Sequence, residues 1–374
     1  MTGAGLLDPL DRLREHLARA DVHQAVLSHP ETLAHLVGFE QPFEDWPVAE
    51  PFTAAPPLLV LGRDDAMLLV PTFFIGRAEG VEIPVVETAS HAFVGQPPDA
   101  TGAFERAVAE LPLEPGRLGV EARVLPLKVG QLLGGQGLDL VPVDETVVAA
   151  RRRKLPAEVE AIRRASSLAD AIQAEVKARA APGISEAELA GLAQAAADRE
   201  AGRRVPAVLT VTAGEATGTG GDVAGSRLLA KGDLVLTDTS PWLGGAWSDT
   251  ANAVVVGEPD AEQRRMFDSV RQALDYAIDL CRPGAVAGDV DQAVRESLSE
   301  WGPPYGHHTG HGIGASWCEP PLVIPGSQDV LEEGMVLAVE PAVYRPDWGG
   351  IRLEHVFVVR AGGNEILTEF EHTL

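Results

Sequence analysis

Apolar and polar residues alternate along the first 150 positions in short runs of two kinds. Aliphatic runs bounded by turn-forming residues are typical of β-strands, and they occupy segments 23–29 and 56–74. Apolar residues at helical spacing occur in segments 1–21, 30–39, 101–111 and 125–135, the last of which has glycines where a helix would end. We therefore expect a small mixed α/β domain over residues 1–150.

A basic run, ARRRK at residues 150–154, separates this region from the rest of the chain. It precedes a long amphipathic pattern over residues 155–180, which predicts a helix. Charge runs of this kind usually contact solvent, so we interpret the basic run as a solvated linker rather than a partner-binding patch. The second domain is then expected over residues 151–374.

The second region contains a faint internal repeat. A helical pattern stops at Pro182-Gly183, and a capping box from Ser185 to Glu188 starts the next helix. The same arrangement recurs around Pro283-Gly284, and each copy continues into an apolar hairpin pattern that carries acidic residues. We expect two related halves whose hairpins face each other.

The acidic residues of these hairpins are the first candidates for chemistry. Asp238 and Asp249 lie in the hairpin pattern at 232–257, where we expect Asp238 to end one strand and Asp249 to sit on the next. Glu340 and Glu354 lie in the pattern at 334–359, and we expect both inside apolar strands. A buried carboxylate is costly unless a cation or hydrogen bonds accept its charge.

Four converging carboxylates, joined by His311, would make a ligand set for two divalent ions. A hydroxide held between ions about 3.5 to 4 Å apart is a strong nucleophile at neutral pH. For any one of these acids alone, an exposed position on an edge strand is the simpler interpretation. Their joint placement in duplicated hairpins favours the metal centre.

Composition excludes several classes of function. The 374 residues include 55 acidic and 30 basic side chains, and the formal net charge of -25 disfavours nucleic acid and anionic lipid as partners. The amino-terminal segment lacks the pattern of a signal peptide, and no apolar stretch of about 18 residues predicts a membrane span. The only cysteines are Cys281 and Cys318, so we expect a reducing, cytoplasmic location.

Five segments in order resemble the motifs of the pita-bread metallopeptidases, which include methionine aminopeptidase, aminopeptidase P, prolidase and the metal-free creatinase. These segments are GDLVLTD, WSDTANA, TGHGIG, VEPAVY and GIRLEHV. The resemblance implies an α+β fold, with a catalytic pita-bread domain of two pseudo-two-fold halves over 151–374. Residues 1–150 would form the smaller creatinase-type N-terminal domain of the Xaa-Pro-cleaving branch.

The resemblance also implies roles for individual residues. Asp238 would bind one metal, Asp249 and Glu354 would bridge, and His311 and Glu340 would bind the other. Glu340 matches the proton shuttle of the family, and His307 would support the loop by hydrogen bonding; we assign both to catalysis. The carboxylate-rich set favours Mn over Co, Zn or Fe, and family precedent suggests a homodimer.

Two single positions depart from the family pattern, as does the segment DTANA at 249–253, which lacks the Thr-Arg pair common there. A non-ligand histidine is usual seven residues after the liganding one, where this chain has Cys318, and a second is usual at the position of Gly221. We assign Cys318, Gly221, Trp317 and Arg352 to the substrate pocket. Cys318 would be a nucleophile only with an adjacent base and a lowered pKa, and a thiolate suits a carboxylate-rich metal site poorly. We favour a small residue that enlarges the pocket.

The sequence therefore predicts a dinuclear metal hydrolase that cleaves short peptides as an Xaa-Pro dipeptidase or aminopeptidase. The first alternative is a non-peptidase that hydrolyses a C–N bond of a small metabolite, as creatinase does. The missing histidines favour it, whereas the retained ligand residues do not. The second alternative is an inactive binding module, which would have no reason to keep five metal ligands.

Overall fold

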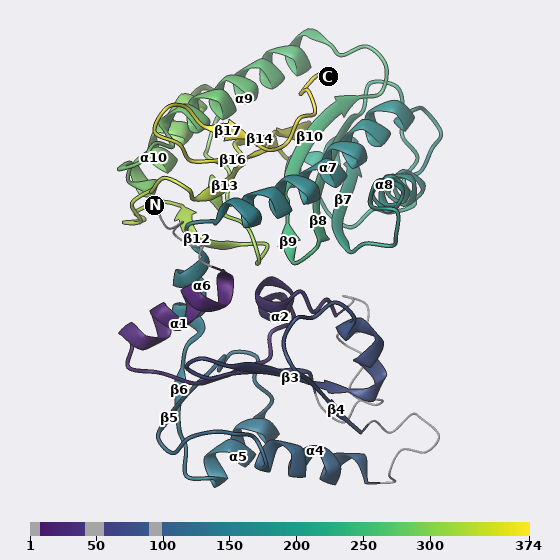
Figure 1. Cartoon of the computed structure of the whole chain (residues 1–374). Coiled ribbons are helices and arrows are strands. Elements are labelled where there is room, and N and C mark those ends of the chain that lie inside the picture. The colour runs from purple at the N-terminus through teal and green to yellow at the C-terminus, as the bar shows by residue number, and fades with distance from the viewer. Residues whose placement is uncertain (1–7, 42–55, 90–98) are drawn as a thin grey trace, which may run out of the picture. The chain divides into compact units, whose positions relative to one another are not determined.

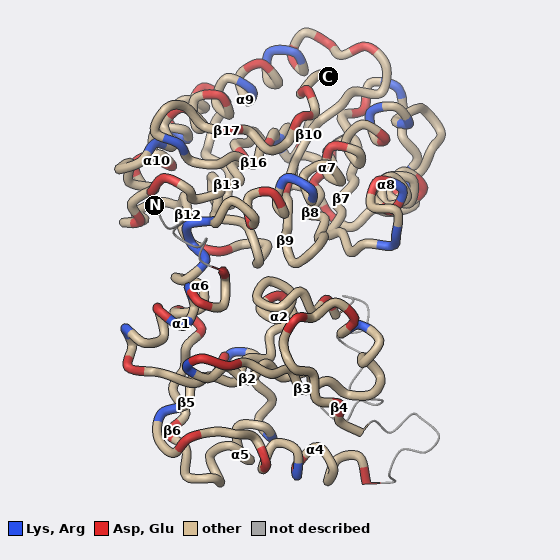
Figure 2. Tube along the Cα trace, viewed as in Figure 1, with Lys and Arg blue, Asp and Glu red and all other residues tan. Residues whose placement is uncertain are grey.

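The chain forms two compact units in a computed structural model that describes residues 8–41, 56–89 and 99–374 (Figure 1). Unit 1 runs from Met1 to Arg151 and unit 2 from Arg152 to Leu374. None of the helices in the described ranges is long and apolar enough to cross a membrane. Acidic residues are spread over helices and loops of both units rather than gathered in one segment (Figure 2).

A six-stranded mixed sheet forms the centre of unit 1, in the order β4-β3-β2-β1-β5-β6. β1 pairs antiparallel with β2 and parallel with β5, so the sheet combines both strand directions. The strands are β1 (Ala25–Leu27), β2 (Leu58–Leu61), β3 (Ala66–Pro71), β4 (Val85–Thr88), β5 (Arg117–Val120) and β6 (Asp139–Pro142). The first three lie within the two segments predicted as strands.

Five α-helices in the described part of unit 1 accompany this sheet, and four of them coincide with segments of helical spacing. They are α1 (Pro9–Arg19), α2 (Pro30–Val37), α4 (Ala100–Ala109), α5 (Leu127–Gly135) and α6 (Asp144–Arg151). The side chain of Asp8 caps α1, and Gly38 ends α2 with a left-handed φ of 69°. Residues 1–7 of the predicted first helix lie outside the described ranges.

The end of the second predicted strand segment is helical instead. After Pro71 the chain forms the 3₁₀-helix η2 (Thr72–Ala78). This turn buries Phe74 in the apolar cluster that also contains Leu13 and Leu68. The apolar run continues past the end of the strand because Phe74 is buried in this core. The pattern of apolar and polar residues alone does not distinguish this turn from a longer strand.

The basic run is not the solvated linker that the sequence suggests. Arg151 is the last residue of α6 and is buried, while Lys154 is only 2% exposed and pairs with Glu319 at 2.9 Å. Arg152 pairs with Asp329, and only Arg153 is mostly exposed. For Arg152 and Lys154, acids more than 150 positions further along the chain provide the partners, which offsets the cost of burying these two cations.

Unit 2 is built from a repeated arrangement. The backbone N–H of Gly183 donates to Leu229 and that of Gly284 donates to Leu331, both at the turn before a helix. The helices that follow are α8 (Glu186–Ala201) and α10 (Ala287–Ser297), and matching isolated bridges join Ser185 to Leu228 and Val286 to Val330. The faint repeat of the sequence therefore corresponds to a repeated backbone structure.

Each half contributes one helix pair and one sheet. α7 (Pro156–Arg179) and α8 lie beside the sheet of β7 (Ala207–Ala213), β8 (Leu234–Leu243), β9 (Ala246–Trp247) and β10 (Thr250–Val255) (Figure 1). α9 (Ala261–Leu280) and α10 accompany the sheet β12-β11-β13-β16-β17. Its strands are β11 (Gly310–Gly312), β12 (Glu319–Val323), β13 (Val336–Val339), β16 (His355–Val358) and β17 (Glu365–Ile366).

Shorter elements complete the unit. β14 (Ala342–Arg345) and β15 (Gly349–Arg352) form a separate hairpin between β13 and β16. The 3₁₀-helices η3 (Gly214–Thr219) and η4 (Ser299–Trp301) follow β7 and α10. One apolar core contains Phe357 and Leu337 with α9 and α10, and another contains Val235 and Ile172 with α7 and α8.

Replacing Lys154 by Met tests whether the buried ion pair supports the loop that ends at Glu319. Removing one partner of a buried pair typically costs about 3–5 kcal/mol of stability. We expect a loss of this order in urea unfolding, and partial recovery when Glu319 is also replaced by Met. Arg153→Met, on an exposed neighbour, is the matched control and should change stability by less than about 0.5 kcal/mol.

Candidate metal centre

The first hairpin places two carboxylates on adjacent strands. Asp238 lies in the middle of β8, where it pairs with Ala251 of β10, and Asp249 immediately precedes β10. The expectation that Asp238 ends its strand and that Asp249 sits within the next is therefore wrong. Asp249 is 3% exposed, and Asp238 is partly buried.

The second hairpin places its two carboxylates at breaks between strands rather than inside them. Glu340 follows the last residue of β13, and Glu354 lies between β15 and β16. Pro341 follows Glu340 and has no N–H to continue a strand ladder, which explains the first break. The backbone N–H of Glu354 donates to Ala251 at 3.0 Å, so the second half is joined to the first beside Asp238.

These four carboxylates and His311 come together in two overlapping groups. Ligand atoms of Asp249, His311 and Glu354 lie within 4.8 Å of one another, and so do those of Asp238, Glu340 and Glu354. Glu354 belongs to both groups. The structure thus brings together all five residues that the sequence suggested as ligands, with one carboxylate shared by the two groups.

Burial of like charges dominates the electrostatics of the metal-free site. Burial, followed by repulsion from the neighbouring acids, raises the pKa of Asp238 to about 7 despite the adjacent Arg352. The same two causes raise the pKa of Glu354 well above its ordinary value. Oε1 of Glu354 is buried and has no hydrogen-bond partner among the described residues. An oxygen in this condition fits a cation ligand.

Glu340 behaves differently because the ring of His308 and the guanidinium of Arg352 lie beside it. Its burial acts to raise its pKa, but hydrogen bonding from His308 and the charges of His307 and Arg352 outweigh that effect and lower it to about 2. Arg352 also contacts Asp238 and donates to the hydroxyl of Tyr344 at 2.9 Å. Arg352 is therefore a buried counter-charge between two carboxylates, and its assignment to the substrate pocket stays a prediction.

His311 is oriented as a metal ligand should be. Its Nδ1 lies 2.9 Å from the carbonyl oxygen of Gly312, to which it donates. That hydrogen bond leaves the lone pair on Nε2, which lies 3.7 Å from Asp249 and 3.9 Å from Glu340. The ring is buried on β11, paired with Ala338 of β13.

His307 has protein partners at both ring nitrogens. Nδ1 lies 2.7 Å from the carbonyl oxygen of His308, and Nε2 lies 3.0 Å from the hydroxyl of Tyr344. Because a carbonyl only accepts, Nδ1 donates and Nε2 accepts from the tyrosine. Arg352, Tyr344 and His307 thus form one hydrogen-bonded chain, which agrees with a supporting position for His307.

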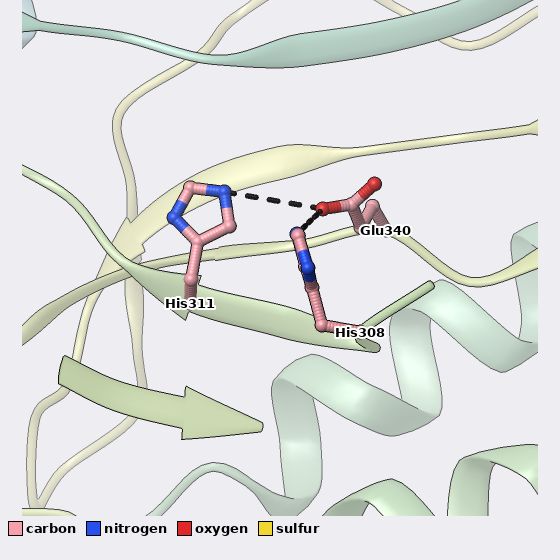
Figure 3. A group of neighbouring side chains, drawn as sticks. All are labelled: His308, His311 and Glu340. Atoms are coloured by element: carbon pink, nitrogen blue, oxygen red, sulfur yellow. Dashed lines mark ion pairs between the residues drawn. The ribbon is translucent and has the colours of Figure 1, made fainter. Parts of the chain in front are cut away.

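Sequence reasoning missed three side chains that contact the ligand residues. His308 places Nε2 at 2.7 Å from Oε1 of Glu340 (Figure 3). Ser240 donates to Oδ1 of Asp249 at 2.9 Å, and the indole N–H of Trp317 donates to Oδ2 of the same carboxylate. Trp317 was expected in the substrate pocket, but no sequence pattern indicated this bond. The doubled histidine HHTGH was the only available signal for His308.

Cys318 and Gly221, the positions that depart from the family pattern, differ in their surroundings. Cys318 is exposed, yet partial burial and the carboxylates of Glu340 and Asp249 raise the pKa of its thiol to about 11. Gly221 has φ of 102°, and a Cβ there would lie 2.7 Å from the methyl of Thr210. A histidine at position 221 would therefore need another loop conformation.

Comparison with known proteins identifies the family. The model of metallopeptidase family M24 matches residues 160–361, and that of the creatinase/prolidase N-terminal domain matches residues 9–153. The chain belongs to metallopeptidase family M24. The α+β fold class predicted from the sequence, with a creatinase-type domain before a pita-bread domain, is confirmed.

Individual relatives of this M24 chain carry peptidase names. A Xaa-Pro dipeptidase of Pyrococcus furiosus is 32% identical over 238 residues, which cover 62% of this chain and 67% of that protein. A putative dipeptidase of Bacillus subtilis, YkvY, is 26% identical over 98% of this chain and 99% of its own length. The chain thus aligns with about two thirds of the Pyrococcus protein and nearly all of the Bacillus one.

Solved structures agree in fold along nearly the whole chain. A Xaa-Pro dipeptidase from Bacillus anthracis superimposes with a TM-score of 0.80 at 23% identity, covering 98% of both chains. An X-Pro aminopeptidase from Thermotoga maritima gives a TM-score of 0.83 at 20% identity, covering 98% of this chain and 99% of that one. At these identities the likeness establishes the shared fold.

The metal-free protein should become less stable as the pH rises from 6.5 to 8.0. Because the pKa values of Asp238 and Glu354 are raised in the folded protein, bound protons on these carboxyl groups stabilise the fold relative to the unfolded chain. This stabilisation is lost as the pH rises through the pKa values of the folded state. We expect the midpoint of thermal unfolding to fall over this range and the increase caused by a divalent ion to be larger at pH 8.0. Asp238→Asn should weaken both trends; a metal effect larger at pH 6.5 would contradict this account.

Cys318 should react slowly despite its exposure. A thiol whose pKa is about 11 has little thiolate at pH 7.5, so alkylation by iodoacetamide should be about 10²-fold slower than for an unperturbed cysteine. Mass spectrometry of timed samples measures the rate, with a cysteine peptide as reference.

Cys318→Ser should change activity by less than about twofold. A hundredfold loss with unchanged metal content would show that the thiol takes part in the reaction.

Proposed function

We propose that this M24 chain is a dinuclear-metal-dependent peptidase that cleaves short peptides at Xaa-Pro bonds, as a dipeptidase or aminopeptidase. The observation that carries the proposal is the convergence of four carboxylates and one histidine between the two halves of unit 2. The peptidase names of the relatives support the substrate class. We take residues 1–150 and 151–374 as the two domains.

In this proposal the five residues divide between two ions. Asp238 would hold one ion, His311 and Glu340 would hold the other, and Asp249 and Glu354 would be shared by both. The membership of Glu354 in both groups supports its bridging role. When bound, the ions supply Lewis acidity and lower the pKa of a water molecule towards neutrality.

The protein's own side chains keep this constellation in place. Ser240 and Trp317 each donate to one oxygen of Asp249, which fixes the orientation of that carboxylate. Glu340 is anionic near neutral pH, as a proton acceptor must be, and its low pKa makes it a weak base until the charges around it change. His307 acts through Tyr344 and Arg352, which steady Asp238 and Glu340 from the protein side.

Hydrolysis of a C–N bond in a small metabolite is the second candidate. It is favoured by the two positions where the chain lacks an imidazole, the exposed Cys318 and the glycine conformation at Gly221. A lost contact to a developing oxyanion costs about 10²–10³ in rate, so ordinary peptides would be turned over slowly unless other donors replace these groups. Manganese, the homodimer and the cytoplasmic location stay predictions from the sequence.

A metal and substrate assay tests the proposal directly. The purified chain is stripped with a chelator, reconstituted with Mn²⁺, Co²⁺, Zn²⁺ or Fe²⁺, and analysed for metal content. We expect close to two ions per chain and metal-dependent cleavage of an Xaa-Pro dipeptide. Ala-Ala, a guanidino acid and a cyclic amide complete the panel. Turnover of either of the last two, without cleavage of peptides, would favour the second candidate.

Within the same assay, Asp249→Asn should be more damaging than His307→Ala. A bridging ligand serves both ions, whereas a supporting group typically changes metal affinity or activity by about 10–100-fold. We expect Asp249→Asn to lose stoichiometric metal and His307→Ala to retain it. Asp268→Asn, on the exposed face of α9, is the matched control. Loss of metal from the His307 variant alone would show that the ligand assignment is wrong.

A further inference from the structure

His308 lies against the same carboxylate as the expected ligand His311. One ring nitrogen of His308, one of His311 and a carboxylate oxygen of Glu340 all lie within 4.8 Å of one another. The two rings are 5.0 Å apart between centroids and nearly perpendicular, and both face Glu340 in Figure 3. Two imidazoles and one carboxylate therefore surround one point at the edge of the site.

The backbone around His308 is held on both sides. The carbonyl of His307 accepts from Arg295 at 2.6 Å, and the carbonyl of His308 accepts from the ring of His307 at 2.7 Å. The N–H of Thr309 donates to Val323, and its carbonyl accepts from the N–H of Glu340 at 2.8 Å. The backbone that carries the His308 ring is thus held in place beside Glu340.

His307 and His308 differ in whether a ring nitrogen is available to bind a metal ion. Both ring nitrogens of His307 are engaged by protein groups. Within the described ranges, the ring of His308 has one hydrogen-bond or ion-pair partner, Glu340. The side chain of His308 is 35% exposed. The ring combines a fixed place beside a ligand residue with access from solvent, which a metal-binding histidine needs.

We propose that His308 is a sixth protein ligand of the metal centre, bound to the same ion as His311 and Glu340. The inference rests on the proposed function, because it presupposes that centre. It changes the chemistry of one ion, whose ligand set gains a second imidazole nitrogen. Imidazole suits Zn, Cu, Fe and Ni, whereas carboxylate and water suit Mn, so the sixth ligand would shift the preference of this ion away from Mn.

The test compares metal binding by wild type, His308→Ala and His308→Gln with that of His23→Gln, a control on a half-exposed histidine of unit 1. Metal-free proteins are titrated with Co²⁺, and the visible ligand-field spectrum and the two dissociation constants are recorded. We expect both His308 variants to bind one of the two ions at least about 10-fold more weakly, with an altered spectrum. The other ion, and the control, should match wild type.

The glutamine variant separates a ligand from a hydrogen-bond donor. Its amide still donates to Glu340, so a histidine that only orients this carboxylate would be replaced without loss of affinity. Wild-type constants and spectrum in His308→Gln would therefore overturn the inference while leaving the proposed function standing. Failure of wild type itself to bind Co²⁺ would overturn both. Competition between Zn²⁺ and Mn²⁺ provides a second measure, since the preference for Zn²⁺ should decrease in both His308 variants.

Discussion

Repulsion among four neighbouring carboxylates is the constraint on which the rest of unit 2 depends. Asp238, Asp249, Glu340 and Glu354 are brought together by two strand systems that are stable for apolar reasons, with cores around Phe357 and Val235. The fold therefore provides the energy that forces these charges into proximity. Arg352 offsets part of the negative charge. The pKa values of Asp238 and Glu354 are still raised, so negative charge remains that metal ions would neutralise.

The residues around these carboxylates are of two kinds. Some hold the carboxylates in place by hydrogen bonds, and others are small residues where the family resemblance implies histidines. Ser240, Trp317 and the chain from Arg352 through Tyr344 to His307 hold individual atoms in place by hydrogen bonds. Cys318 and Gly221 instead remove bulk and donors where related enzymes are expected to have imidazoles.

The family resemblance implied the fold class, whereas the repeat and the acids in apolar runs predicted that five residues converge. The repeat places hairpins in register, and an acid in an apolar run is conspicuous wherever it occurs. The sequence could not predict partners that are distant along the chain. The burial of Lys154 depends on Glu319, and the role of Trp317 depends on Asp249. The break at Glu340 was available in principle, since Pro341 cannot continue a ladder, but the apolar run on either side favoured an uninterrupted strand.

The duplicated backbone has a consequence for cooperativity. Asp238 and Asp249 come from the first half, and His311, Glu340 and Glu354 come from the second, so separating the halves dismantles the whole ligand set. A bound ion stabilises only conformations in which the set is complete. Partial opening of either half would then forfeit the entire binding free energy, so in the metal-loaded protein the two halves would open together, as one cooperative unit.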